Sequence, residues 1–267
     1  MRFIVCVKLT PDTEQLGEVR PEKVGSSDLG VTMVLNPWDE FAVEEALLLT
    51  ERYRGDTLAI TMGGAETVEA LKRAVAMGIG EAQLLSDDAF AGSDAWGTAT
   101  ILAQAIRAQD GWQQGLILSG KQSVDSNSGL VGPGVASKLG IPYVSNVVKI
   151  DEVGEGYAIV RRMLDEGMQT VRVTLPAVVA VSIEINEPRY PNFMGIRKAS
   201  KMKYPALGAN DLPGLDRGGI GPAAARIQWL DLRKAPKRSA QCEFIQAATP
   251  AEAAALLADR LMAEKVF

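Results

Sequence analysis

Five short runs of almost uninterrupted apolar residues constrain the fold of this chain more than any other feature. A strand with one face in water alternates apolar and polar residues, whereas a strand that is apolar throughout must be covered on both faces. Segments with the period of an amphipathic helix lie between the runs, as in parallel strands joined by crossover helices. The sequence therefore predicts a doubly wound, mostly parallel α/β sheet. The runs are FIVCV (3–7), TLAIT (57–61), AQLLS (82–86), GLILSG (115–120) and PAVVAVSI (176–183).

Three segments between these runs carry the signals of helices. Residues 39–53 have a helical apolar pattern, and residues 66–78 end at Gly78, a residue that suits the left-handed conformation of a helix C-cap. Residues 93–109 begin with Ser93, whose hydroxyl can accept a hydrogen bond from a free backbone N–H of the first turn. We expect one helix over each segment.

A different pattern follows in the second half of the chain. Residues 157–164 (YAIVRRML) and 168–175 (MQTVRVTL) have the composition of strands. They flank a turn at Glu166-Gly167, and short turns that contain glycine are typical of hairpins. The sequence predicts a β-hairpin that is added to the sheet.

The last quarter of the chain lacks the pattern of the body. After Tyr204 the sequence becomes rich in Gly and Pro and shows no sustained period. Residues 249–252 (TPAE) form a capping box with proline at the first helical position, which predicts a helix over 250–264. We expect an α/β body of residues 1–204 and a C-terminal arm of residues 205–267.

Composition excludes several classes of function. With no histidine, the chain lacks the commonest general base, the commonest metal ligand and every Ser-His or Cys-His nucleophile pair. Its two cysteines, Cys6 and Cys242, do not have the spacing of a metal site or a disulfide scaffold. The net charge of −5 argues against nucleic acid as a partner, because phosphates are bound by basic surfaces. The sequence predicts no catalytic residues and no metal ligands.

The sequence also bears on the location of the protein. No apolar run approaches the roughly 18 residues that would cross a bilayer. The first residues, MRFIVCVK, become polar too soon for a signal peptide. We expect a cytoplasmic protein without direct membrane insertion.

Three loops rich in small residues follow predicted strands. They are residues 7–12 (VKLTPD), 62–65 (MGGA) and 119–134 (SGKQSVDSNSGLVGPG). Sheets of this type bind ligands at the carboxyl ends of their strands, and a helix that begins near Ser128 would direct its positive end to an anion there. A nucleotide phosphate is the expected ligand, although the strict dinucleotide and P-loop fingerprints are absent. Gly and Ser as plain turn formers are the alternative interpretation.

Several motifs in this order resemble the β (small) subunit of electron-transfer flavoproteins. The resemblance covers roughly residues 2–203, and the combination of NEPRY with the preceding LPAVV is highly specific. It implies a Rossmann-like fold of the adenine-nucleotide-binding type. The motifs are VCVK, LNPWDEFAVEEAL, AVAMGIGEAQLL, LILSGKQSVDSNSGLVGPGVASKLGIP, LPAVVAVSIEINEPRYP and IRKASKMK.

The resemblance implies an electron carrier subunit rather than a self-sufficient enzyme. In that family the β subunit pairs with a larger α subunit, which holds most of a redox-active FAD, and the heterodimer carries electrons between a flavin dehydrogenase and an acceptor. The β subunit itself binds AMP or, in electron-bifurcating members, a second FAD in the same pocket. A stand-alone ATP- or AMP-binding module of the same fold, without redox activity, is the alternative function.

The family also implies a set of nucleotide-binding positions at the carboxyl ends of the strands. Asn127 and Leu130 depart from the family, which has an acidic residue and a glutamine at these positions, while VGPG at 131–134 is closer to the bifurcating branch. Whether AMP or FAD is bound stays open. The implied positions are Cys6, Asn36, Asp39, Met62, Gly63, Gly120, Asp125, Asn127, Ser128, Gly129, Leu130, Val131 and Gly132.

Residues 186–201 (NEPRYPNFMGIRKASK) carry the last functional prediction. In the family this is a recognition loop, here called the partner loop, which binds the dehydrogenase. Phe193 and Met194 align with its apolar anchor, and Arg197, Lys198 and Lys201 would attract an acidic partner. From the residues alone, Phe193 and Met194 could instead fold back into the core.

Overall fold

The computed structural model describes residues 1–24, 28–227, 230–234 and 242–266, which fall into two compact units. The first unit, Met1–Leu232, contains the sheet and its helices, and the second, Arg233–Phe267, contains the terminal helix. Residues 205–232 therefore pack with the body. Among the described residues, no helix has the length and apolar character needed to cross a membrane.

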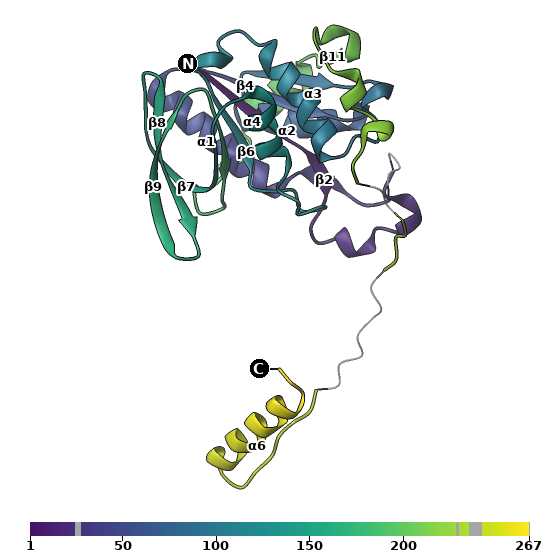
Figure 1. Ribbon diagram of the computed structural model, residues 1–267, viewed down its shortest axis with the longest axis vertical. Coiled ribbons are helices and arrows are strands. Elements are labelled where there is room, and N and C mark those ends of the chain that lie inside the picture. Colours follow the sequence, from purple (N-terminus) through teal and green to yellow (C-terminus); the bar gives the residue numbers. More distant parts are fainter. Residues whose placement is uncertain (25–27, 228–229, 235–241, 267) are drawn as a thin grey trace. The chain divides into compact units, whose positions relative to one another are not determined.

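One mixed sheet forms the centre of the first unit (Figure 1). Neighbouring strands are parallel from β11 through to β7, and β8 and β9 then continue the sheet in antiparallel pairing. The predicted α/β class and the mostly parallel sheet are confirmed. In spatial order the strands are β11 (Ala206–Leu207), β5 (Glu81–Leu85), β4 (Asp56–Met62), β1 (Arg2–Cys6), β6 (Leu116–Gly120), β10 (Ala177–Val181), β7 (Tyr143–Gly154), β8 (Tyr157–Leu164) and β9 (Gly167–Thr174).

Helices cover both faces of the parallel part. On β1, Phe3 and Val5 face a core shared with α1 and α2, whereas Ile4 between them faces a core shared with α3 and α4. Alternate side chains of one apolar strand thus fill two separate cores, which explains why the runs show no polar alternation. The helices are α1 (Pro37–Tyr53), α2 (Val68–Met77), α3 (Ala95–Arg107), α4 (Val131–Leu139) and α5 (Phe193–Lys201).

The order of the strands creates a switch point between β1 and β6. From β1 the chain passes outward to β4 and β5 on one side, and it then returns to β6 on the other side of β1. The loops that leave the carboxyl ends of β1 and β6 therefore diverge, and a crevice between them is the usual ligand site of such sheets.

The hairpin is present with a slightly different turn. Strands β8 and β9 pair from Tyr157–Thr174 to Leu164–Gly167, so the turn residues are Asp165 and Glu166, and Gly167 already belongs to the second strand. The ribbon of β7, β8 and β9 lies at the left of Figure 1. Its register with β10 through β7 makes it a continuation of the sheet, as predicted.

Two predicted helix starts are wrong. Helix α3 is capped by Asp94 rather than Ser93, because the Asp94 carboxylate accepts hydrogen bonds from the backbone N–H groups of Trp96 and Gly97. The helix expected near Ser128 begins at Val131, since residues 127 and 129 have positive φ angles that a helix does not allow.

Short elements complete the chain. In the second unit, α6 (Pro250–Ala263) begins as predicted: the Thr249 hydroxyl accepts from the backbone N–H of Glu252, and Pro250 occupies the first turn. The two-stranded sheet and the 3-10 turns are β2 (Leu9–Pro11), β3 (Met33–Leu35), η1 (Leu16–Glu18), η2 (Pro21–Lys23), η3 (Ala65–Thr67), η4 (Asp88–Phe90), η5 (Trp112–Gln114), η6 (Ala209–Asp211), η7 (Arg217–Gly219) and η8 (Pro222–Ala224).

Candidate functional site

A buried carboxylate lies at the switch point and joins the ends of its two strands. Asp39, in the first turn of α1, accepts a hydrogen bond of 2.9 Å from the backbone N–H of Lys8, just after β1. Its other oxygen accepts one of 3.0 Å from the backbone N–H of Gly120, the last residue of β6. The carboxylate is thus fully engaged with backbone donors, and its role is to position the walls of the crevice.

Two features of the surroundings follow from this burial. Burial raises the pKa of Asp39 to about 7, although its hydrogen bonds from Asn36, Lys8 and Gly120 favour the ionised form. The approach of α1 to β6 also depends on Gly120, because a Cβ there would lie 2.6 Å from the Asp39 Oδ1 and 2.7 Å from the Trp38 Cβ. Any side chain at position 120 would push α1 away from the sheet.

Asn36, immediately before α1, fixes the loop that follows β6. Its side-chain nitrogen donates to the carbonyl of Gln122 over 2.9 Å, and its side-chain oxygen accepts from the backbone N–H of Val124 over 3.2 Å. Its own backbone N–H donates to the carbonyl of Lys8 over 2.8 Å. A single buried amide therefore ties together the loops after β1 and β6.

The side chain of Lys8 bridges the same two loops at the surface. The Lys8 Nζ lies 2.6 Å from one oxygen of Asp125 and 2.9 Å from the other, and 3.5 Å from the Ser123 hydroxyl. Burial acts to raise the pKa of Asp125, but the charge and hydrogen bonds of Lys8 hold it below its usual value. Lys8 was not among the predicted site residues, and its position directly after the first strand was the available signal.

The backbone after this bridge turns sharply toward α4. Asn127 has a φ of +50° and Gly129 a φ of +60°. The Asn127 side-chain oxygen accepts from the amide of Gln122 over 3.1 Å, so it braces the loop internally. A Cβ at Gly129 would meet the carbonyl of Lys121 at 3.2 Å in addition to this unfavourable φ. Ser128 and Leu130 are exposed between them.

The remaining predicted positions line the carboxyl ends of β1, β4 and β6 or the first turn of α4. Cys6 and Met62 pack against the core on the α3 and α4 side. Burial raises the pKa of the Cys6 thiol to about 12, and the charge of Asp39 adds to this rise, so the thiol is protonated at neutral pH. Gly63 directly follows β4, and Val131 and Gly132 open α4.

The predicted nucleotide positions therefore gather at one edge of the sheet, but they do different work. Asn36 and Asp39 are engaged with backbone groups, whereas Ser128, Gly129 and Leu130 lie in the loop that leads into the N-terminus of α4. The hydroxyl of Ser119, in β6, is buried without a hydrogen-bond partner among the described residues. This edge offers backbone donors, small residues and a helix N-terminus, which suit a phosphate group.

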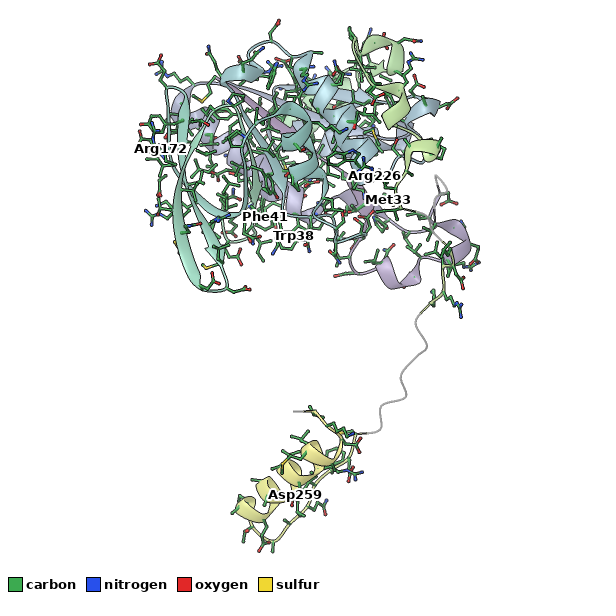
Figure 2. The ribbon with its side chains drawn as sticks, in the orientation of Figure 1. Met33, Trp38, Phe41, Arg172, Arg226 and Asp259 are labelled. Carbon is green, nitrogen blue, oxygen red and sulfur yellow. The ribbon has the colours of Figure 1, made fainter. Side chains whose placement is uncertain are left out.

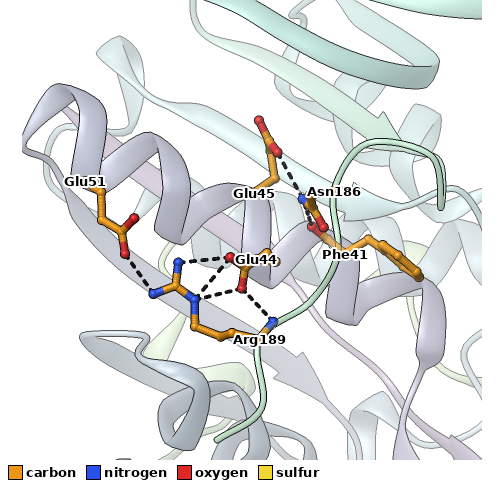
Figure 3. A network of polar contacts seen from close by, with 6 residues as sticks. All are labelled: Phe41, Glu44, Glu45, Glu51, Asn186 and Arg189. Carbon is orange, nitrogen blue, oxygen red and sulfur yellow. Dashed lines mark hydrogen bonds and ion pairs between the residues drawn. The ribbon is translucent and has the colours of Figure 1, made fainter.

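The partner loop is fastened to α1 by a network of charges (Figure 3). The Arg189 guanidinium forms hydrogen bonds of 2.9 to 3.1 Å with both oxygens of Glu44 and one of 2.7 Å with Glu51. The amide of Asn186 donates to Glu45 over 3.0 Å and to the carbonyl of Phe41 over 3.1 Å. An ion pair between Arg189 and Glu187, suggested by their proximity in sequence, is wrong, because Arg189 binds α1 instead.

The second half of the partner loop is a helix rather than a loop. Its N-cap is Asn192, whose side-chain oxygen accepts from the backbone N–H of Gly195 over 2.8 Å. On its inner side Ala199 is buried, and Gly195 approaches the carbonyl of Ala76 in α2 so closely that a Cβ would lie 2.1 Å from it. The prolines precede the helix and therefore do not interrupt it.

Large apolar side chains point outward from this loop and helix. Phe193 is 78% exposed, Met194 68% and Tyr190 90%. They do not fold back into the core, and Tyr190 is an exposed aromatic that the sequence analysis did not single out. The Lys198 Nζ donates to the carbonyl of Ile79 over 3.1 Å, so this residue helps to fasten α5. The loop thus presents an apolar surface on a braced support.

Comparisons with known proteins agree on one family. The family model described as electron transfer flavoprotein domain matches residues 27–212. The chain is 37% identical over 224 residues to the electron transfer flavoprotein subunit beta of Thermoanaerobacterium thermosaccharolyticum, with 83% of each chain covered. It is 32% identical over 268 residues to the caffeyl-CoA reductase-Etf complex subunit CarD of Acetobacterium woodii, with 100% of each covered. It is 35% identical to protein FixA of Bradyrhizobium diazoefficiens over 79% of this chain and 74% of the relative.

Proposed function

The chain belongs to the electron transfer flavoprotein family and is similar to its β subunits over most of its length, and on this premise we propose how it works. It pairs with an α subunit that holds most of a redox-active FAD, and the heterodimer carries electrons between a flavin-containing dehydrogenase and an acceptor. Its own chain supplies a nucleotide site and a docking loop rather than a catalytic group.

The observation that carries this proposal is the crevice at the switch point. Asp39, Asn36 and Lys8 hold its walls through hydrogen bonds that join the loops after β1 and β6. The loop from Asp125 to Leu130 then leads into α4, where free N–H groups of the first turn and the positive helix end favour a phosphate. We propose that AMP, or the ADP portion of a second FAD, is bound along this edge.

Exposed apolar side chains support the docking role of the partner loop. Phe193 and Met194 project from a helix that is fixed to α2, and the preceding segment is fixed to α1 through Arg189. A rigid support with exposed apolar groups loses little conformational entropy when a partner covers it. We propose that the dehydrogenase binds here, with Arg197 and Lys201 attracting an acidic surface.

The terminal helix supplies a second apolar surface. Within its own unit, Leu256 and Leu257 of α6 are each about half exposed, and Met262 is 59% exposed. A helix of 14 residues is marginal in isolation, because its stability normally comes from burying an apolar face. We propose that this helix contacts the α subunit.

Co-purification and flavin counting test the proposal. The full chain is isolated from its source with whatever protein it retains, and the absorbance spectrum and released nucleotides are recorded. We expect a yellow complex with a second chain; one flavin per heterodimer with AMP released identifies AMP as the ligand here, and two flavins identify a second FAD. A colourless monomer that binds ATP would overturn the electron-transfer proposal and support the stand-alone nucleotide-binding alternative.

A further inference from the structure

A pocket of about 330 Å³ opens between the first turns of α3 and α4. It belongs to the first compact unit, and its walls come from three separate segments of the chain. The sequence analysis assigned a role only to Leu130 among the residues that line it. The lining residues are Asp94, Ala95, Trp96, Leu130, Pro133, Gly134, Arg226 and Ile227.

The pocket has a flat aromatic wall and apolar sides. Trp96 is held along α4, where Gly134 approaches α3 so closely that a Cβ would lie 2.7 Å from the Cβ of Ala99. Leu130, 52% exposed, and Pro133 supply further apolar surface. A half-buried indole beside exposed aliphatic groups is a typical packing surface for a planar ring.

The charges around the pocket are predominantly positive. The guanidinium of Arg226 lies 5.3 Å from the centre of the Trp96 ring, and the Lys138 Nζ lies 4.6 Å from it. The only carboxylate of the lining, Asp94, already accepts from the backbone N–H groups of Trp96, Gly97 and Arg226. Its acceptors are thus occupied, which leaves Arg226 and Lys138 to act on an anionic ligand.

Continuity with the proposed phosphate loop indicates what the pocket binds. Leu130 is both the last residue of that loop and part of the pocket wall. The proposed adenosine-binding positions, among them Cys6, Asn36 and Met62, lie at the ends of β1 and β4 or before α1. The pocket instead lies at the first turns of α3 and α4, beyond the loop.

We propose that this pocket holds the second ring system of a dinucleotide whose phosphates lie on the loop from Asp125 to Leu130. Trp96 packs against the flat ring, and the guanidinium of Arg226 closes over the ring and the adjoining phosphate. The inference rests on the proposed nucleotide function and adds to it, because it favours an FAD-type ligand over AMP in this subunit.

Affinities for two probes test the inference. The full chain, in the complex in which it is isolated, is freed of nucleotide from this subunit, and FAD and AMP are titrated separately by calorimetry. We expect Trp96→Ala to raise the Kd for FAD by about tenfold, the loss of one ring contact, and to leave the Kd for AMP within about twofold. Trp96→Phe keeps a flat ring and should stay within about threefold of the wild type for FAD.

A second pair of variants keeps the test valid if Trp96→Ala does not fold. Arg226 is exposed, and Arg226→Ala should raise the Kd for FAD several-fold with AMP unchanged. Arg217→Ala, which removes an equally exposed arginine of the same segment away from the pocket, should change neither.

The outcomes separate this inference from the proposed function. Unchanged FAD affinity in both Trp96→Ala and Arg226→Ala would overturn the inference, as would an equal loss for AMP and FAD, which would place the adenine in the pocket. If the wild type binds neither probe, the proposed nucleotide function itself fails.

Discussion

Removing the guanidinium of Arg189 is the sharpest perturbation of the partner loop. Arg189→Ala deletes every side-chain contact between this residue and Glu44 and Glu51, while the backbone N–H of residue 189 can still donate to Glu44. The side chain of Glu44 is only 5% exposed, so it is left as a buried carboxylate without its cation. We expect the loop to detach from α1 and the protein to lose stability.

The magnitude follows from the burial of the two partners. Removing one partner of a fully buried ion pair typically destabilises a protein by about 3–5 kcal/mol. Because the Arg189 side chain is 36% exposed, water screens part of this interaction, and we expect about 2 kcal/mol. For a domain of this size that corresponds to a fall in Tm of about 4–8 °C.

Thermal unfolding and backbone hydrogen exchange measure the two parts of the effect. The fall in Tm reports global stability, and faster exchange in residues 186–192 reports local detachment of the loop. Glu51→Gln is the matched control, because its carboxylate is 59% exposed and its pair with Arg189 is worth less than about 1 kcal/mol. Adding Glu44→Gln to Arg189→Ala removes the isolated charge and should restore about half of the lost stability.

Two results would refute this reasoning. A Tm for Arg189→Ala within about 1 °C of the wild type, with unchanged exchange in residues 186–192, means that the network does not support the loop. If Glu51→Gln destabilises as strongly as Arg189→Ala, the exposed pair rather than buried Glu44 dominates the network.

Three further predictions concern the crevice and the anchor. Because the pKa of Asp39 is raised from 3.8 to about 7, the folded state holds this proton more tightly than the unfolded state, and stability falls as pH rises from about 4 to 7. The stability of Asp39→Asn relative to wild type should therefore rise by about 2–3 kcal/mol between pH 5 and pH 8 in urea unfolding; parallel curves would contradict this. Gly129→Asp places a carboxylate and a strained φ in the phosphate loop, so nucleotide released on denaturation should fall sharply, and unchanged content would place the ligand elsewhere. Phe193→Ala should change Tm by less than about 2 °C yet slow flavin reduction by the dehydrogenase at least about tenfold, whereas a large fall in Tm with a normal rate would refute the anchor.

The strands could be predicted because their side chains must enter two cores at once. Apolar residues at consecutive positions such as Phe3, Ile4 and Val5 leave no solvent-facing side, so the parallel sheet is written into local sequence. The hairpin was equally local, since β8 and β9 pair directly across a short turn. Helix starts were less accurate, because Asp94 and Ser93 are both good caps and only the folded backbone selects one.

The site was predicted as a region but not as a set of interactions. Family resemblance located the loops around Asn36, Asp39 and Gly129, yet the bonds from Asp39 to Lys8 and Gly120 join residues 31 and 81 positions away. Arg189 likewise selects Glu44, 145 residues away, over nearby Glu187. Such partners depend on the strand order and on which helix faces which loop, and neither is encoded in spacing along the chain.

Helix α1 connects the two functional regions through one rigid element. Its first turn carries Asp39, which fixes the crevice, and its middle and end carry Glu44 and Glu51, which fix the partner loop through Arg189. Buried polar groups at both ends have few alternative partners, so a shift of α1 at the crevice would have to break or carry with it the contacts to the loop. This arrangement fixes the position of the apolar anchor relative to the proposed nucleotide site. Electron transfer between flavins needs such a fixed geometry on this subunit, because the partner that docks on the loop must present its flavin at a constant place while the remainder of the complex moves.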